Sequence, residues 1–150
     1  SYSSKDDISD ETTLSKTLDD ATDDTSAHNQ SSIVFLLETD EKQKFLFTGD
    51  AGRDAFNHVP QTLLGKVKDV TWMKVPHHGS KHNLDSTIIK HVNPEIAYIS
   101  TEKQGKYLNR STVFALKKNG TKVYSTSQNR STIRHGAIKT REGWTKIEPM

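Results

Sequence analysis

The sequence contains no cysteine. Without thiols, the chain can form neither disulfide bonds nor thiolate metal sites, so any metal ion that it binds must be held by His, Asp, Glu or water. No apolar run approaches the ~20 residues that span a bilayer. The opening stretch SYSSKDDISDETT has neither the positive region nor the apolar region of a signal peptide. We therefore expect a soluble, cytoplasmic chain.

Hydrophobic residues are also scarce, at 31% of a chain of 150 residues. That length suffices for one domain with a real core, so the scarcity indicates that part of the chain lies outside it. In residues 1–30, eight acidic residues oppose two lysines, so this segment carries −6 and residues 31–150 carry +8. We predict that residues 1–30 form an acidic, mobile loop or lead-in that adds little to the core. Leu14 and Leu18, spaced four apart, leave open a short helix over residues 11–21.

Beyond residue 30, apolar strand patterns alternate with helical patterns, which predicts a layered α/β fold. In the first strand the apolar residues are consecutive, so we expect both of its faces to be covered. A helix over residues 53–65 contains Pro60, which interrupts or kinks it, and a later helix takes Ser111 as its N-cap. The expected strands are 33–37, 44–48, 70–75, 96–100 and 122–126; the other expected elements are helices over 83–95 and 110–120 and a hairpin over 131–149.

Three side chains that can bind metals follow directly after predicted strands. Asp50 follows the strand KFLFT, and His77 and His78 follow the strand that ends in WMKVP. Sites in layered α/β folds form where strands end, because the loops there point to a common edge. A carboxylate with imidazoles suits Zn, Mn or Fe. The alternative for Asp50 is a structural role as a helix N-cap or as an Asx-turn residue. The alternative for the two histidines is a polar turn without a ligand.

The stretches NQSSIVFLLE, KFLFTGDA, DVTWMKVPHHGSKHN, NPEIAYIS and LKKNGTKVYST together resemble the metallo-β-lactamase superfamily. More narrowly, they are similar to the hydrolase domain of ComEC-type competence proteins. The resemblance covers residues 29–126. It implies an αββα sandwich, in which two β-sheets pack face to face with helices outside.

The resemblance also implies a site with two divalent metals, Zn or Mn, that is built from several motifs. Asp50 matches the aspartate that bridges the two metals. The segment VPHHG favours His78 as a ligand, with His77 as an indirect contact or a proton donor, although the reverse order stays open. Ser80, Asn109 and Arg110 are candidate substrate-binding residues.

The chain departs from the family pattern at two places. It has no His-x-His-x-Asp-His string, the family's first metal motif, and it has Asn109 and Arg110 where close ComEC relatives carry His-Pro. The chain therefore resembles only the C-terminal half of the sandwich, in residues 31–150. His28 lies near a further ligand position of the family, but a solvated loop histidine is the simpler interpretation.

These observations favour a metal-dependent hydrolase whose two-metal mechanism acts on a phosphodiester, in nucleic acid or a nucleotide. His77 or His78 would orient or protonate the leaving oxygen. The expected partner is the missing N-terminal half or another protomer, and the chain alone is expected to be inactive. The alternatives are a non-catalytic interaction module and a β-lactamase proper.

Overall fold

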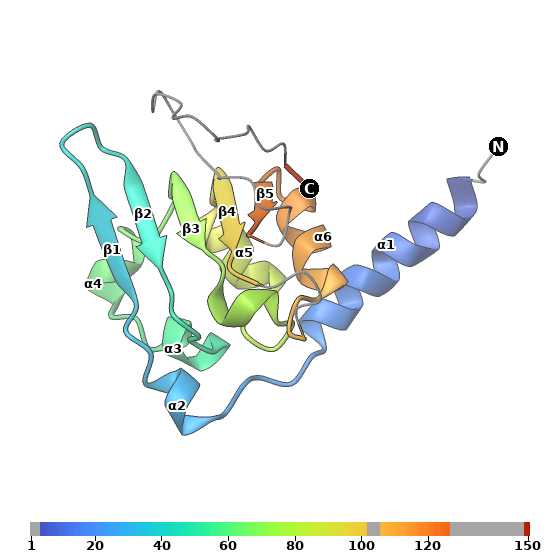
Figure 1. The fold of residues 1–150 in the computed structure, drawn as a ribbon, viewed down its shortest axis with the longest axis horizontal. Coiled ribbons are helices and arrows are strands. Elements are labelled where there is room, and N and C mark those ends of the chain that lie inside the picture. Colours follow the sequence, from blue (N-terminus) through green and yellow to red (C-terminus); the bar gives the residue numbers. More distant parts are fainter. Residues whose placement is uncertain (1–3, 102–105, 127–148) are drawn as a thin grey trace.

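The computed structural model describes residues 4–101, 106–126 and 149–150, and it is a mixed α/β fold. Its five strands form one sheet in the order β1-β2-β3-β4-β5, with helices on one side (Figure 1). The strands are β1 (Phe35–Glu38), β2 (Lys44–Phe47), β3 (Trp72–Lys74), β4 (Ile96–Ile99) and β5 (Lys122–Ser125). The helices are α1 (Ser4–Asp19), α2 (Ala27–Gln30), α3 (Arg53–Asn57), α4 (Gln61–Leu64), the 3₁₀-helix η1 (Pro76–Gly79), α5 (Ser86–Val92) and α6 (Arg110–Lys118).

Connection length explains the direction of each strand. A short polar turn joins β1 to β2, which pair antiparallel. The other neighbours pair parallel, and each of these connections crosses through helical segments. The carboxyl ends of β2 and β3 therefore lie at the same edge of the sheet, and Figure 1 shows α2 and α3 at that edge.

One face of the sheet makes the core. Leu46, Met73, Ala97 and Val123 occupy matching positions on β2, β3, β4 and β5 and are fully buried. They belong to the same hydrophobic cluster as Ile89 of α5 and Leu116 of α6. Burying apolar side chains between the sheet and the helices is the main driving force for this arrangement.

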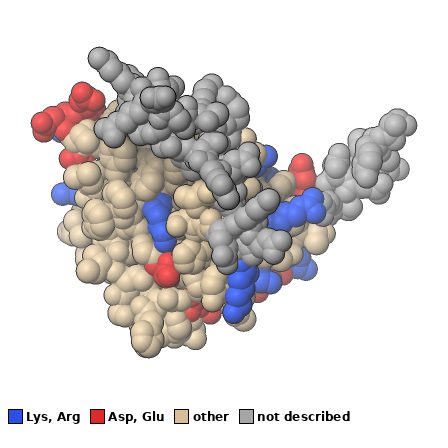
Figure 2. Space-filling model, in the orientation of Figure 1, with Lys and Arg blue, Asp and Glu red and all other residues tan. Residues whose placement is uncertain are grey.

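The opposite face of the sheet carries a row of aromatic rings. Successive ring centroids lie 4.6 Å apart for Phe35 and Phe47, 5.0 Å for Phe47 and Trp72, and 5.4 Å for Trp72 and Tyr98. Tyr98 stacks in turn on Tyr124 of β5, at 5.2 Å. We call this side of the sheet the aromatic face. Figure 2 views the molecule from this side, and few charged side chains are visible over β1, β2 and β3.

The first strand corrects one prediction. Phe35 and Leu37 are each 51% exposed, and Ile33 just before the strand is 81% exposed. The consecutive apolar residues therefore do not mean that the described residues cover both faces of β1. They reflect a strand at the edge of the sheet whose aromatic face lacks a second layer in the structure described.

The helices agree with the sequence in kind but differ at their ends. Pro60 breaks the predicted helix over 53–65 in two and is the N-cap residue of α4. The N-cap of α6 is Asn109 and not Ser111, because the side-chain Oδ1 of Asn109 accepts from the Ser111 N–H at 2.9 Å. Gly120 follows α6 with φ +87°, which is the left-handed geometry that favours glycine there.

The prediction that residues 1–30 add little to the core is wrong. Leu18 of α1 is 0% exposed and belongs to the hydrophobic cluster. Asp19 accepts a hydrogen bond from the Ser86 N–H at 2.8 Å, and the Asp23 carboxylate accepts from the Arg53 and Asp54 N–H groups at 2.9 and 3.0 Å. These contacts place the acidic side chains at the starts of α5 and α3, where unpaired N–H groups and the helix dipole favour negative charge. Composition alone does not reveal such pairing.

The predicted hairpin over 131–149 lies almost wholly outside the described residues. Within the part of the chain that is described, no helix is both long enough and apolar enough to cross a bilayer.

Candidate functional site

The strand-end residues gather at the carboxyl edge of β2 and β3. Asp50 follows β2, and both His77 and His78 lie in η1 just after β3. The His77 N–H donates to the Gly49 carbonyl at 3.4 Å, which joins the two loops. This shared edge is where the sequence predicted the site, because β2 and β3 run parallel.

The backbone of the histidine pair is strained. His77 has φ 42° and ψ 51°, and His78 has φ 56° and ψ 24°, both left-handed. For residues other than glycine this conformation costs about 1–2 kcal/mol each. Backbone hydrogen bonds hold the turn, from Ser80 N–H to the His77 carbonyl at 3.0 Å and from Asn109 N–H to the Gly79 carbonyl at 3.1 Å. Strain of this kind, held by surrounding structure, is common at functional sites.

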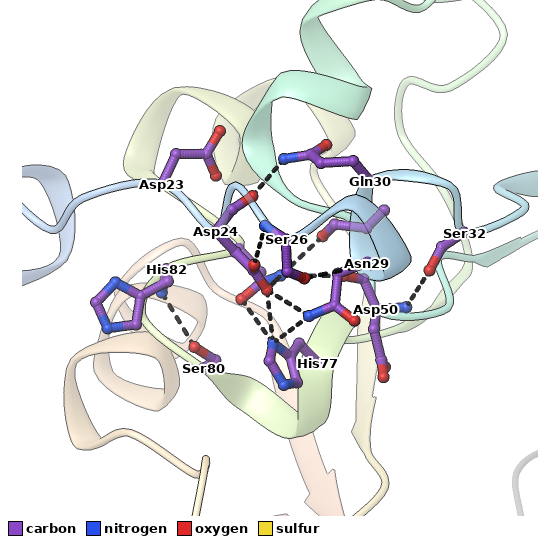
Figure 3. Close-up of polar contacts among 12 residues, drawn as sticks. Asp23, Asp24, Ser26, Asn29, Gln30, Ser32, Asp50, His77, Ser80 and His82 are labelled. Carbon is purple, nitrogen blue, oxygen red and sulfur yellow. Dashed lines mark hydrogen bonds and ion pairs between the residues drawn. The ribbon is translucent and has the colours of Figure 1, made fainter.

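Asp24 lies against the His77 ring, and sequence reasoning missed it (Figure 3). Its Oδ2 is 3.0 Å from His77 Nδ1, and it accepts from Asn29 Nδ2 at 2.5 Å and from Asn83 Nδ2 at 3.2 Å. Its Oδ1 accepts from the Ser26 N–H at 3.0 Å. Asp24 and His77 are 53 positions apart, so no local spacing could have indicated this contact.

The environment of Asp24 keeps its carboxylate ionised. Burial by itself would raise the pKa of Asp24, but the hydrogen bonds donated by Asn29, Ser26 and Asn83 outweigh it. The pKa of Asp24 therefore lies well below its ordinary value. The site thus contains a fixed negative charge beside the imidazole of His77.

The His78 ring is also held through its Nδ1, which lies 2.5 Å from the Ser100 carbonyl oxygen. Because a carbonyl oxygen can only accept, Nδ1 must carry the proton. In the neutral ring, Nε2 is then unprotonated and can bind a metal or accept a proton. Tyr107 covers both histidines, with its ring centroid 4.5 Å from that of His77 and 6.0 Å from that of His78.

Asp50 pairs with a lysine from the aromatic face. Lys74 Nζ lies 3.2 Å from Asp50 Oδ1 and also donates to the Gly49 carbonyl. The Asp50 side chain does not cap α3. The N-cap residue of this helix is Gly52, and the carboxylate that accepts from the first N–H groups of the helix, those of Arg53 and Asp54, is Asp23. The alternative of a merely capping Asp50 is therefore wrong. Lys74 was not predicted, since a lysine inside a strand carries no sequence signal of its partner.

The metal site was tested against these contacts. The kinds of donor fit zinc or manganese, because a carboxylate and two imidazoles lie at one edge. The number is too small: across residues 4–101, 106–126 and 149–150, no group of three or more His, Asp or Glu side chains is placed to hold a metal ion. The separation of Asp50 from His78, which we expect to be below about 8 Å for a shared binuclear cluster, stays a prediction.

The three candidate substrate-binding residues have different settings. Ser80 is 4% exposed, and its hydroxyl accepts from the His82 N–H at 3.2 Å, so it holds the turn. Asn109 caps α6, with its side chain bonded to Ser111. Arg110 is exposed in the first turn of α6. His28, in α2, is exposed as the simpler interpretation expected.

Comparison with known proteins gives one partial match. The chain is 30% identical over 128 residues to ComE operon protein 3 of Bacillus subtilis (strain 168). The match covers 84% of this chain but only 16% of that protein. No family model matches the chain. No solved structure gives a significant match.

Proposed function

We propose that this chain supplies part of the active site of a metal-dependent hydrolase that cleaves a phosphodiester, in nucleic acid or a nucleotide. The observation that carries the proposal is the gathering of Asp50, His77 and His78 at one strand edge, with the Nδ1 of both rings engaged. Such outer contacts orient imidazoles for metal binding or proton transfer. The resemblance of residues 29–126 to ComEC-type hydrolase domains suggests the same class, and the similarity to ComE operon protein 3 is compatible with a link to competence proteins.

Each residue has a role in this proposal. Asp50 and His78 hold the metal pair, together with ligands from outside the described residues, and His77 is either a further ligand or the group that moves a proton at the leaving oxygen. Two bound divalent metals, Zn or Mn, would supply an activated hydroxide and neutralise charge on the phosphoryl group. Lys74 holds the Asp50 carboxylate at the strand edge. Lys106 offers positive charge beside Tyr107, with its Nζ 5.3 Å from the ring centroid, which suits an anionic substrate.

The finer fold belongs to the proposal as well. We infer that the sheet is one half of an αββα sandwich and that a second sheet covers the aromatic face. The exposed apolar side chains in and before β1, those of Ile33, Phe35 and Leu37, support this, because monomeric proteins rarely leave a contiguous apolar surface uncovered. The second sheet would come from a preceding N-terminal half or from another protomer.

The deciding experiment compares the 150-residue chain with the longer natural protein. Each is loaded with Mn or Zn and assayed for phosphodiester cleavage, with Asp50→Ala as the variant and Asp54→Ala, on exposed α3, as the matched control. We expect activity only in the longer protein, lost in Asp50→Ala and kept in Asp54→Ala. Turnover by the short chain that Asp50→Ala abolishes would show that it contains a complete site.

A non-catalytic interaction module is the second candidate. The small number of metal ligands in the described residues favours it. A longer protein that binds no Mn or Zn and cleaves no phosphodiester would decide for the module.

A further inference from the structure

We propose that Asp24 is a positioning residue for His77. Its carboxylate holds the neutral imidazole with the proton on Nδ1, so that Nε2 is unprotonated and can bind a metal or accept a proton. Only the role of Nε2 in metal binding or proton transfer rests on the proposed function. The arrangement itself rests on the contacts around the ring.

The hydrogen-bond partners around His77 determine which ring nitrogen carries the proton. Asn83 Nδ2 donates to the carbonyls of Asp50 and Ala51 at 3.1 and 3.2 Å, as well as to Asp24. Its amide oxygen is therefore the atom turned to His77, 3.2 Å from Nδ1. The ring nitrogen thus faces two acceptors, that oxygen and Asp24 Oδ2 at 3.0 Å, so it must donate.

One neighbour of the ring is a donor, and it is already committed. Asn29 Nδ2 lies 3.4 Å from His77 Nδ1, but it lies only 2.5 Å from Asp24 Oδ2. Its shorter contact places one of its two amide protons on the carboxylate. Because His77 Nδ1 and Asp24 Oδ2 are themselves only 3.0 Å apart, they lie on the same side of this nitrogen, and its second proton points away from the ring. It therefore does not compete for the lone pair of a deprotonated Nδ1.

Asp24 is anchored independently of His77, as a positioning residue must be. The backbone N–H of Asp24 donates to the His82 carbonyl at 3.1 Å, and the backbone carbonyl of Asp24 accepts from Gln30 Nε2. The side chains of Asp24 and His77 are only 12% and 17% exposed. An ionised acceptor in such a setting makes a short, strong hydrogen bond.

His78 provides an internal comparison. Its Nδ1 donates to a backbone carbonyl, that of Ser100, which no substitution at Asp24 removes. The two adjacent rings therefore hold the same tautomer through different acceptors. Only the tautomer of His77 should depend on Asp24.

The test is the ¹⁵N spectrum of the two rings in protein labelled at histidine, recorded well above the ordinary histidine pKa of about 6.5 so that the rings are neutral. The signals are assigned by their loss in His77→Gln and His78→Gln. In the wild type we expect His77 Nδ1 at the protonated position and Nε2 at the unprotonated one. In Asp24→Ala, both His77 signals should move toward intermediate positions while those of His78 stay. Asp23→Ala is the control: it removes the two hydrogen bonds that the neighbouring carboxylate accepts from Arg53 and Asp54, and it should leave the signals of both rings unchanged.

Two results would overturn the proposal: a wild-type His77 protonated on Nε2, or His77 signals that Asp24→Ala does not move. If Asp24→Ala does not fold, Asp24→Asn serves. Its neutral oxygen is a weaker acceptor, so the Nδ1 proton should move upfield, and an unmoved proton contradicts the proposal. The measurement uses neither metal nor substrate. A missing hydrolase activity and a wrong role for Asp24 therefore give different results.

Discussion

At the scale of single residues, the backbone of the histidine pair has a measurable cost. In His78→Ala the Cβ remains in the left-handed conformation, whereas His78→Gly removes it. Both variants lose the contact with Ser100 equally. We therefore expect His78→Gly to have the higher free energy of unfolding, by about 1–2 kcal/mol, in urea denaturation.

Lys117 is the control for this comparison, because it is exposed in the regular helix α6. There the order should reverse, with Lys117→Ala more stable than Lys117→Gly by about 1 kcal/mol. The same order at both positions would mean that the turn at His78 carries no strain.

The lowered pKa of Asp24 predicts how stability depends on pH. A carboxyl whose pKa falls on folding stabilises the protein above its unfolded pKa, here 3.8, and loses that contribution as the pH drops toward the folded value. Asp24→Asn has no such titration. The difference in unfolding free energy between wild type and Asp24→Asn should therefore be largest above about pH 5 and shrink below about pH 4. Urea denaturation at a series of pH values measures it, and a constant difference would contradict the assignment.

Sequence could predict the place of Asp50 and of the two histidines, because each follows a strand pattern directly. It could not predict Asp24, Lys74 or Asn83. Their partners lie on other segments, and an aspartate among eight acidic residues has no distinguishing mark. The strand-end rule identifies the edge where a site forms, and the side chains that hold the site come from contacts between loops.

At the scale of elements, the helix α1 provides a direct test of the acidic segment. Leu18 is fully buried, whereas Leu14, one turn earlier, is only partly covered. Leu18→Ala should lower the free energy of unfolding by about 2–5 kcal/mol, as deletion of a buried leucine side chain does. Leu14→Ala should cost clearly less in the same urea titration. Equal, small effects would return α1 to the role of a lead-in outside the core.

Beyond residue 30, the five strands and most of the helices could be predicted in kind and order, because they depend on local pattern, whereas α2 and η1 were not predicted. Pro60 ends a helix wherever it stands in one, and Gly120 suits the residue after α6. The choice between Asn109 and Ser111 as N-cap could not be made, since both side chains can cap. The contribution of residues 1–30 to the fold depends on contacts with the starts of α3 and α5, at Arg53 and Ser86. These helix starts lie far along the chain, so local pattern does not reveal the contacts.

At the scale of the whole molecule, the layered α/β fold followed from alternating strands and helices. The uncovered aromatic face did not follow, because consecutive apolar residues look the same whether helices of this chain or another sheet cover them. Tyr98 and Trp72 pack side by side on that face. The face explains why the strands are apolar on both sides although the helices cover only one.

The aromatic face yields the last prediction. Phe35 and Leu37 are half exposed on it, so replacing both by Thr keeps a strand-forming residue at each position and removes only half-buried side chains. The double variant should lower the free energy of unfolding by about 1–2 kcal/mol. In sedimentation experiments the 150-residue chain should self-associate as its concentration rises, because the uncovered rings attract each other, and the double variant should stay monomeric. Leu36→Thr is the matched control: Leu36 packs against the core on the opposite face, so its loss should destabilise the fold without reducing association. A wild-type chain that stays monomeric at high concentration would show that the aromatic face needs no cover.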